Sequence, residues 1–191
     1  MFYKIIIFKL FIIFVIIIEN IYIHSIRAIK ICLCTYGKKE NRYIREFVEH
    51  YKKLGIDKIF LYDNNNIKGE RFQEKINDYI RNKFVELINL RGVILKSIMN
   101  IYNHCYNKNK DKYDWLIYYE IDEFIFLKNY SLLKDYLKQV KFNKCDSILL
   151  NWVHLSDNNL IYYDNRTLSI RFTERGENVK KTMNLHLLNQ L

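Results

Sequence analysis

Residues 29–62, IKICLCTYGKKENRYIREFVEHYKKLGIDKIFLY, decide the fold. Residues 29–35 form an apolar run of strand length, and residues 58–62 form a second one. Between them, residues 41–54 carry apolar side chains at helical spacing, and Gly55 ends that helix where a left-handed residue is needed. The residues at helical spacing are Ile44, Phe47, Val48 and Tyr51. The stretch therefore predicts a βαβ unit.

Outward from this unit, strands and helices continue to alternate. We expect helices over residues 70–82, 95–106 and 131–138, and strands over residues 84–88, 115–119 and 147–153. Asn41 is the expected cap of the first helix. Such alternation predicts an α/β fold with a mostly parallel sheet and helices on both faces. Residues 29–191 would form one domain, with a single boundary before it.

The N-terminal residues 1–28 are expected to form an apolar signal or anchor segment. Residues 10–18 have the length of a signal-peptide core, whereas Glu19, Asn20 and His24 interrupt the run before the ~20 apolar residues of a spanning helix. We therefore expect a membrane-associated protein with a single-pass anchor, in the secretory pathway if the source is eukaryotic. The alternative is an extension that packs on the domain, which would leave the protein cytoplasmic.

The net charge of +10 and the pI of about 9.3 raise the question of a nucleic-acid partner. However, basic and acidic residues alternate along the chain, and no long block of one sign is present. The absence of Pro and the single Ala28 also indicate the codon bias of an AT-rich genome, which inflates the Lys content. We therefore expect no nucleic-acid partner.

Four cysteines do not show the paired spacing of a zinc site. Cys32 and Cys34 alternate with apolar neighbours, which favours two small buried side chains on one strand face. The other two are Cys105 and Cys145, and a disulfide between distant cysteines is left open.

Polar, acid-bearing segments follow three of the predicted strands, at residues 35–41, 63–66 and 120–124. In an open α/β sheet, ligands bind beyond the carboxyl ends of the strands. We therefore expect these three segments to meet and form a binding site.

Glu120, Asp122 and Glu123 place three carboxylates within one turn, directly after a buried strand. Because like charges repel and an unpaired buried carboxylate is costly, a divalent cation would compensate them. Hard oxygen ligands suit Mg²⁺ or Mn²⁺, which could stabilise a leaving diphosphate. The alternative is an exposed acidic turn that merely ends a strand.

Several motifs occur in a recognisable order along the chain. They are Tyr36-Gly37-Lys38-Lys39-Glu40-Asn41, Tyr43-Ile44-Arg45-Glu46-Phe47, His50-Tyr51, Leu54-Gly55-Ile56-Asp57, Leu61-Tyr62-Asp63-Asn64-Asn65, Ile101-Tyr102-Asn103-His104-Cys105, Trp115 and Ile121-Asp122-Glu123-Phe124-Ile125. Together they resemble the GT-A glycosyltransferases of the family 2-like and family 92 group, from about residue 29 to about residue 181. The resemblance implies a GT-A-type, Rossmann-like fold, a nucleotide-sugar donor and a divalent cation.

Carried over to these positions, the resemblance implies that Tyr36, Glu40 and Asp63 lie at the nucleotide sugar, with Asp63 at the base or ribose. Asp122 would bind the metal, and Glu120 would face the metal or the ribose. Glu120 departs from the Asp usual there, which changes its reach.

Other positions have two readings each. Arg45 could pair with a phosphate or be a surface charge, and Trp152 could line the sugar pocket or pack in the core. His186 could be a late metal ligand, although its leucine neighbours favour a helix face. No catalytic base is identified among the late acids Asp157, Glu174 and Glu177, and we expect the domain to be incomplete at its C-terminus.

The resulting hypothesis is a metal-dependent glycosyltransferase that moves a sugar to a hydroxyl of a glycan, lipid or protein, with inversion. The alternatives are a non-catalytic nucleotide-sugar-binding remnant of that fold and a membrane-attached basic scaffold.

Overall fold

The structure is a computed structural model, which describes residues 13–15, 28–94, 97–142, 144–151, 153, 155–156, 162, 166–172 and 184–189. Several predicted features lie outside these residues. They are most of the segment 1–28, and the side chains of Trp152, Asp157, Glu174, Glu177 and His186.

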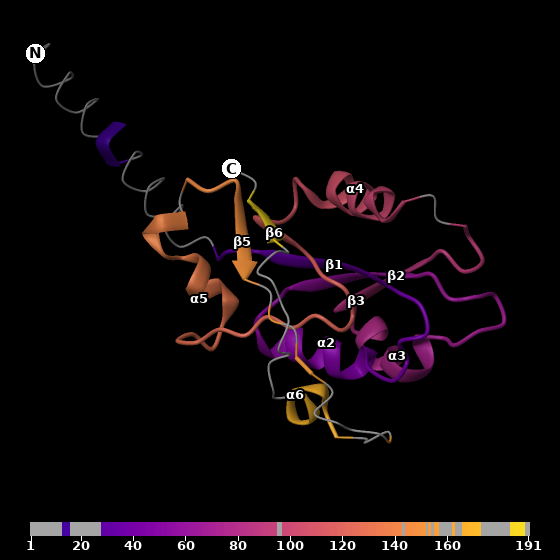
Figure 1. Cartoon of the computed structure of the whole chain (residues 1–191). Coiled ribbons are helices and arrows are strands. Elements are labelled where there is room, and N and C mark those ends of the chain that lie inside the picture. Colours follow the sequence, from indigo (N-terminus) through magenta and orange to yellow (C-terminus); the bar gives the residue numbers. More distant parts are fainter. Residues whose placement is uncertain are drawn as a thin grey trace, which may run out of the picture.

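One six-stranded sheet organises the described chain (Figure 1). Its order is β3-β2-β1-β4-β6-β5, in which β3, β2, β1 and β4 are mutually parallel and β6 is antiparallel to both of its neighbours. The strands are β1 (Ile31–Gly37), β2 (Lys58–Asp63), β3 (Val85–Asn89), β4 (Trp115–Tyr118), β5 (Ser147–Asn151) and β6 (Asn184–Asn189). The predicted α/β class with a mostly parallel sheet is confirmed.

Helices cover both faces of this sheet, as predicted. Figure 1 shows α2 (Ile44–Lys53) and α3 (Gln73–Arg81) on one side and α4 (Ile98–Asn109) on the other. The shorter helices are α5 (Leu133–Leu137), the 3₁₀ turn η1 (Val140–Phe142) and α6 (Leu168–Arg171).

The alternation of side chains along β1 produces two cores. Ile31 and Leu33 point to the α2 side and join a large aliphatic and aromatic cluster with Phe47. Cys32 and Cys34 point to the α4 side and join a smaller cluster. A strand buried on both faces is typical of a parallel sheet, and it explains why residues 29–35 are continuously apolar.

Three local predictions are wrong. Asn41 does not cap α2, because the N-cap is Tyr43, two residues later, and the Asn41 side chain donates to Arg71 O at 3.1 Å instead. The helix predicted from residue 95 begins at Ile98, where Ser97 caps it by accepting from Met99 N at 3.1 Å. His186 lies on β6 rather than on a helix, because this strand pairs with both β4 and β5.

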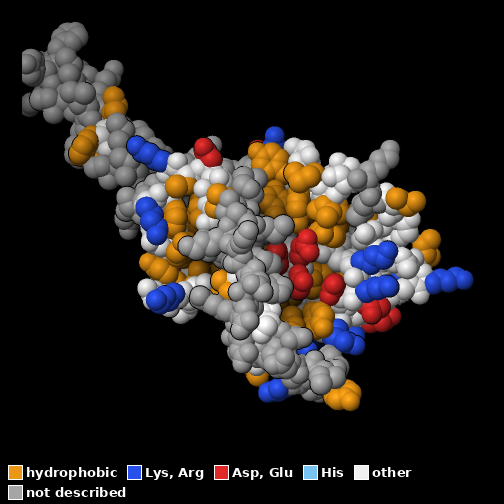
Figure 2. All heavy atoms as spheres, viewed as in Figure 1, with side chains coloured by type: hydrophobic (Ala, Val, Ile, Leu, Met, Phe, Trp, Pro, Cys, Tyr) orange, Lys and Arg blue, Asp and Glu red, His pale blue; other side chains and the backbone are white. Residues whose placement is uncertain are grey.

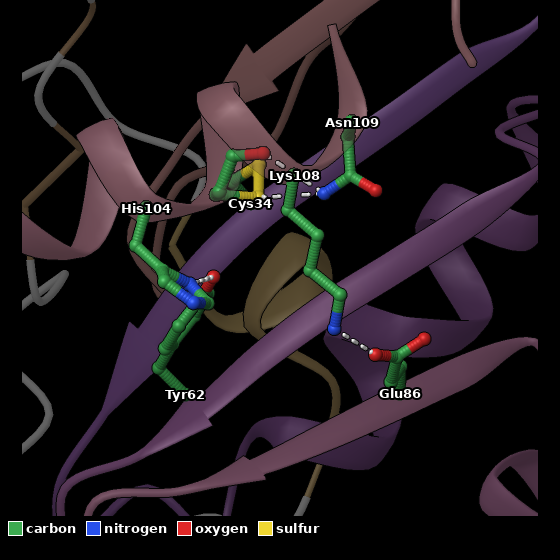
Figure 3. Close-up of a disulfide and its surroundings, with 7 residues drawn as sticks. Cys34, Tyr62, Glu86, His104, Lys108 and Asn109 are labelled. Atoms are coloured by element: carbon green, nitrogen blue, oxygen red, sulfur yellow. Dashed lines mark hydrogen bonds and ion pairs between the residues drawn. A yellow bond between two sulfur atoms is a disulfide. The ribbon is translucent and has the colours of Figure 1, made fainter. Parts of the chain in front are cut away.

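The prediction of two small buried cysteines on one strand face is confirmed, and the distant disulfide that the sequence left open is present. Cys32 and Cys34 are both buried on the same face, but Cys34 is bonded to Cys105 of α4 across 71 positions of sequence (Figure 3). The bond ties α4 to the central strand of the sheet. Cys32 keeps a thiol, whose pKa is raised by burial.

In the part of the chain that the structure describes, no helix combines the length and apolarity that a bilayer crossing needs. The predicted anchor therefore stays a prediction.

Candidate functional site

The carboxyl ends of the parallel strands meet at one edge of the sheet. Gly37 at the end of β1 is paired in register with Asp63 at the end of β2, and Asp63 is paired with Asn89 at the end of β3. On the other side of β1, Cys34 pairs with Tyr118, the last residue of β4. The segments predicted to form a binding site therefore start from adjacent positions.

A tight turn follows β4 and displays the acidic side chains. Glu123 N donates to Glu120 O at 3.1 Å, and Glu120 N donates back to Glu123 Oε2 at 2.9 Å. These reciprocal bonds close the turn and leave Glu120 and Asp122 exposed, whereas Ile121 between them is buried. The turn thus fixes which carboxylates face solvent.

Ile121 fixes the turn to the end of β1. A Cβ placed on Gly37 would lie 2.1 Å from Ile121 Cδ1 and 2.9 Å from Phe72 Cζ, so no other residue fits at position 37 without displacing them. This glycine is required by close approach rather than by a left-handed conformation.

Helix α2 holds the turn from below. Tyr51 Oη donates to Glu123 O at 2.9 Å, and His50 Nε2 lies 3.0 Å from Ile125 O, so this nitrogen carries the proton and donates. The Phe124 ring packs edge-on against both Phe47 and His50. The backbone of the turn is therefore fixed by hydrogen bonds and by aromatic packing.

The carboxylates of this edge influence one another. The pKa of Glu40 is raised by burial and then by the negative charges of Asp122, Glu70 and Glu120. Burial, together with the charges of Glu120 and Asp122, raises the pKa of Glu123 to about 7, against the lowering effect of its hydrogen bond with the Glu120 backbone. Figure 2 shows acidic side chains gathered on the visible face beside apolar ones. The carboxylates of this edge therefore repel one another, and a bound cation would relieve that repulsion.

Tyr36 is part of the same group. Its hydroxyl donates to Glu120 Oε1 at 3.0 Å, and its ring lies edge-on to Tyr102 of α4. Burial and the neighbouring Glu120 carboxylate raise the pKa of Tyr36 to about 12, so the phenol stays protonated and orients Glu120.

Asp63 lies at this edge in a different setting. Its carboxylate is 1% exposed, accepts two hydrogen bonds from Asn65 and forms an ion pair with Arg91 at 3.0 Å. Its partners are therefore groups of the protein itself.

The acidic side chains that the structure describes at this edge do not enclose a metal site on their own. Among the described residues, no three His, Cys, Asp or Glu side chains are arranged to hold a metal ion by themselves. Mg²⁺ typically takes one or two carboxylates and completes its shell with substrate phosphates and water. Asp122 and Glu120, both exposed on one turn, supply the chemistry of such an open site.

The structure thus brings Tyr36, Glu40, Glu120 and Asp122 together and places Asp63 beside them, buried. Arg45 is a surface charge, because it bonds Asp78 at 2.8 Å and Glu49 at 3.3 Å. Sequence reasoning missed Arg91, which follows β3. The rule that named the segments after three strands applies equally to the fourth and would have found it.

The comparisons agree with the resemblance seen in the motifs. The model of glycosyltransferase family 92 matches residues 27–186, so the chain belongs to glycosyltransferase family 92. A family 92 protein of Oryza sativa subsp. japonica is 25% identical over 112 residues, which are 59% of this chain and 19% of the relative. One of Arabidopsis thaliana is 25% identical over 97 residues, which are 51% of this chain and 16% of the relative.

The chain therefore spans less than a fifth of the length of these relatives in the matched regions. Among solved structures, the crystal structure of S. aureus TarS 1-349 is similar with a TM-score of 0.48 and 14% identity, over 63% of this chain and 35% of that chain.

Proposed function

We propose that this chain binds a nucleotide-sugar donor through a divalent cation and transfers the sugar to a hydroxyl acceptor. The single observation that carries the proposal is the hydrogen-bonded turn of residues 120–123, which exposes Glu120 and Asp122 at the carboxyl edge of the parallel sheet. Membership of glycosyltransferase family 92 supports it.

The chain's own residues would have separate roles. Asp122 is the principal metal ligand, and Glu120, oriented by the Tyr36 hydroxyl, is the second. Glu40 adds its negative charge to those of Asp122 and Glu120. The segment that begins at Asp63 forms the neighbouring wall of the donor site. A bound Mn²⁺ or Mg²⁺ would supply Lewis-acid stabilisation of the leaving diphosphate.

The transfer proposed is a direct displacement with inversion, as the resemblance implies. The bond from the acceptor oxygen to the anomeric carbon forms as the bond to the diphosphate breaks, and a carboxylate takes the acceptor proton. We assign this base to none of the residues that the structure describes. The acceptor is a hydroxyl of a glycan, a lipid or a protein.

For location, we propose that residues 1–28 act as a signal or anchor and that residues 29–191 form the donor-binding domain. The Cys34–Cys105 disulfide supports maturation in an oxidising compartment, since such bonds are rare in the cytosol.

The proposal is tested with Asp122→Asn, which removes the charge and keeps the shape. We expect binding of a uridine or guanosine diphosphate sugar in the presence of Mn²⁺ to weaken at least about tenfold, because a charged ligand is lost. Glu74→Gln is the matched control, because Glu74 is exposed on α3 outside the site. The measurement is titration calorimetry with and without Mn²⁺, followed by an assay of sugar release.

Three results would count against the proposal. Wild-type protein that binds no nucleotide sugar with Mn²⁺ contradicts it, as does equal binding by Asp122→Asn. Binding without any sugar release or transfer would leave the non-catalytic remnant as the function.

A further inference from the structure

One guanidinium organises the whole loop that follows β2. Arg91 Nη2 donates to Asn66 O at 2.7 Å, Gly69 O at 2.9 Å and Ile67 O at 3.1 Å. Arg91 Nη1 donates to Glu70 O and to the Asp63 carboxylate at 3.0 Å. These are five acceptors for one side chain, which is 12% exposed.

The Asp63 carboxylate completes this arrangement from inside. Oδ2 takes the ion pair with Arg91, while Oδ1 accepts from the Asn65 backbone at 2.9 Å and from the Asn65 side chain at 2.8 Å. A carboxylate that is 1% exposed needs such compensation, because an unpaired buried charge is strongly unfavourable. Asp63 and Arg91 therefore hold the loop as a unit.

The loop is bonded in turn to the segment after β1. Asn65 Oδ1 accepts from Lys39 N at 2.8 Å, and it thereby holds Lys39 in a left-handed conformation with φ 65°. Asn41 N donates to Glu70 Oε2 at 3.0 Å. Both bonds flank Glu40, whose pKa responds to the charges of Asp122 and Glu70. A change in the loop would therefore reach the acidic edge.

We propose that Arg91 is the positioning residue of the donor site. It sets the loop of residues 64–70 and, through Asn65, the segment of residues 39–41, so that the nucleoside meets a preformed wall. This inference rests on the proposed function, because it assigns that wall to the nucleotide part of the donor. Asp63 acts on the donor through the loop that it orders.

Lysine cannot replace arginine in this role. The guanidinium presents its donors in a fixed planar fork, whereas an ammonium is a single point with three donors. Arg91→Lys keeps the charge beside Asp63 but cannot reach the carbonyls on both sides of the fork. The substitution therefore separates charge neutralisation from loop organisation.

The experiment compares Arg91→Lys with Arg81→Lys, an exposed arginine at the end of α3. Trypsin cuts after lysine and arginine alike, so neither variant changes the number of cleavage sites. Cleavage after Lys68, inside the loop, is followed by mass spectrometry. Binding of UDP and of GDP, each with Mn²⁺, is measured by calorimetry, and donor KM and kcat are measured with the nucleotide sugar that binds.

For Arg91→Lys we expect cleavage after Lys68 to be about tenfold faster and nucleotide binding to be about tenfold weaker. Donor KM should rise while kcat stays within about twofold, because the residue acts on donor binding and not on the reacting atoms. Arg81→Lys should match the wild type in all three. If Arg91→Lys fails to fold, Asn65→Ser removes the side-chain amide that bonds Lys39 and Asp63, leaves the Arg91 fork in place, and should weaken nucleotide binding in the same way.

Two results overturn the inference directly. One is cleavage after Lys68 at the wild-type rate, since Arg91 would then not hold the loop. The other is faster cleavage with unchanged nucleotide binding, since the loop would then lie outside the donor site. If wild-type protein binds no nucleotide with Mn²⁺, the proposed function itself fails. The role of Arg91 in donor binding then fails as well, whatever the rate of cleavage after Lys68.

Discussion

The face of the sheet under α2 and the face under α4 bury different kinds of side chain. On the α2 face, Phe47, Tyr51 and Phe72 are fully buried among aliphatic side chains from the strands. On the α4 face the cluster is smaller and contains the Cys34–Cys105 disulfide. The first face is held by apolar burial, and the second depends on a covalent bond to compensate for a smaller core.

Polar contacts reinforce the α4 face around the disulfide. Tyr62 Oη lies 2.8 Å from His104 Nδ1, and Asn109 donates to Cys105 O at 2.9 Å (Figure 3). Lys108 reaches from the same helix to Glu86 of β3. Helix α4 is thus fixed to three strands by individual contacts rather than by a broad apolar surface.

The candidate site lies where the two faces meet. Ile121 anchors the acidic turn in the α2-side core, whereas Tyr36 reaches Glu120 from the α4 side. Damage to either face should therefore reach the site, by different routes and to different degrees.

The largest effect should come from removing the disulfide with Cys34→Ala and Cys105→Ala together. The free energy of unfolding should fall by about 2–4 kcal/mol, since the bond closes a loop of 71 positions. Urea unfolding with and without a reducing agent measures it. Cys32→Ala, which removes a buried thiol with no disulfide, is the control.

Hydrogen exchange sharpens this comparison. After loss of the disulfide, amides of α4 should exchange faster, while those of α2 keep their protection relative to global unfolding. If the unfolding midpoint of the wild-type protein does not change when reducing agent is added, the stability of the α4 face does not depend on the disulfide.

A smaller effect is expected from Gly37→Ala on the other face. The added Cβ overlaps Ile121 Cδ1 and the Phe72 ring. The free energy of unfolding should therefore fall by about 1–3 kcal/mol, and the acidic turn should shift. Ile121→Ala removes the overlapping atom. The double variant Gly37→Ala with Ile121→Ala should therefore be more stable than the sum of the single changes predicts.

The measurement is a double-mutant cycle of urea unfolding, with Mn²⁺-dependent nucleotide binding recorded for each variant. Additive free energies would mean that Ile121 does not pack on Gly37.

The periodicity of apolar side chains and the positions of the strand ends predicted the central part of this fold. The βαβ unit, the parallel strands and the acidic turn after β4 all follow from side-chain periodicity and from the rule of carboxyl ends. The sequence did not predict which side chains bond to each other, because those pairs depend on how the strands and helices are placed next to one another. The Cys34–Cys105 bond needs α4 to lie over β1, and the Asp63–Arg91 pair needs β2 and β3 to be adjacent.

Local capping rules failed for a related reason. Asn41 precedes α2 as a cap should, yet tertiary bonds to Glu70 and Arg71 take up its backbone and side-chain donors. The role of each site residue toward donor and metal stays a prediction, since it depends on ligands and not on the chain alone.

The smallest effect concerns His50, which ties α2 to the segment after the acidic turn. Burial lowers the pKa of His50 below its ordinary value of 6.5; Lys53 acts in the same direction, while the Ile125 carbonyl and Glu46 oppose it. The unfolded chain therefore binds a proton at higher pH than the folded one. The neutral His50 ring contributes its full stabilisation above the pKa that His50 has in the unfolded chain. This contribution is lost as pH falls through the lower pKa that His50 has in the folded chain.

His50→Gln keeps an N–H donor without the titration, and His50→Phe removes the donor at a cost of about 1 kcal/mol. Between about pH 7.5 and about pH 5 the wild type should lose stability relative to His50→Gln, as urea unfolding at each pH would measure. Because the bond holds Ile125 and not the exposed carboxylates, Mn²⁺-dependent nucleotide binding at neutral pH should change less than in Gly37→Ala. Parallel pH curves for the wild type and His50→Gln would place the proton uptake elsewhere and contradict the lowered pKa of His50.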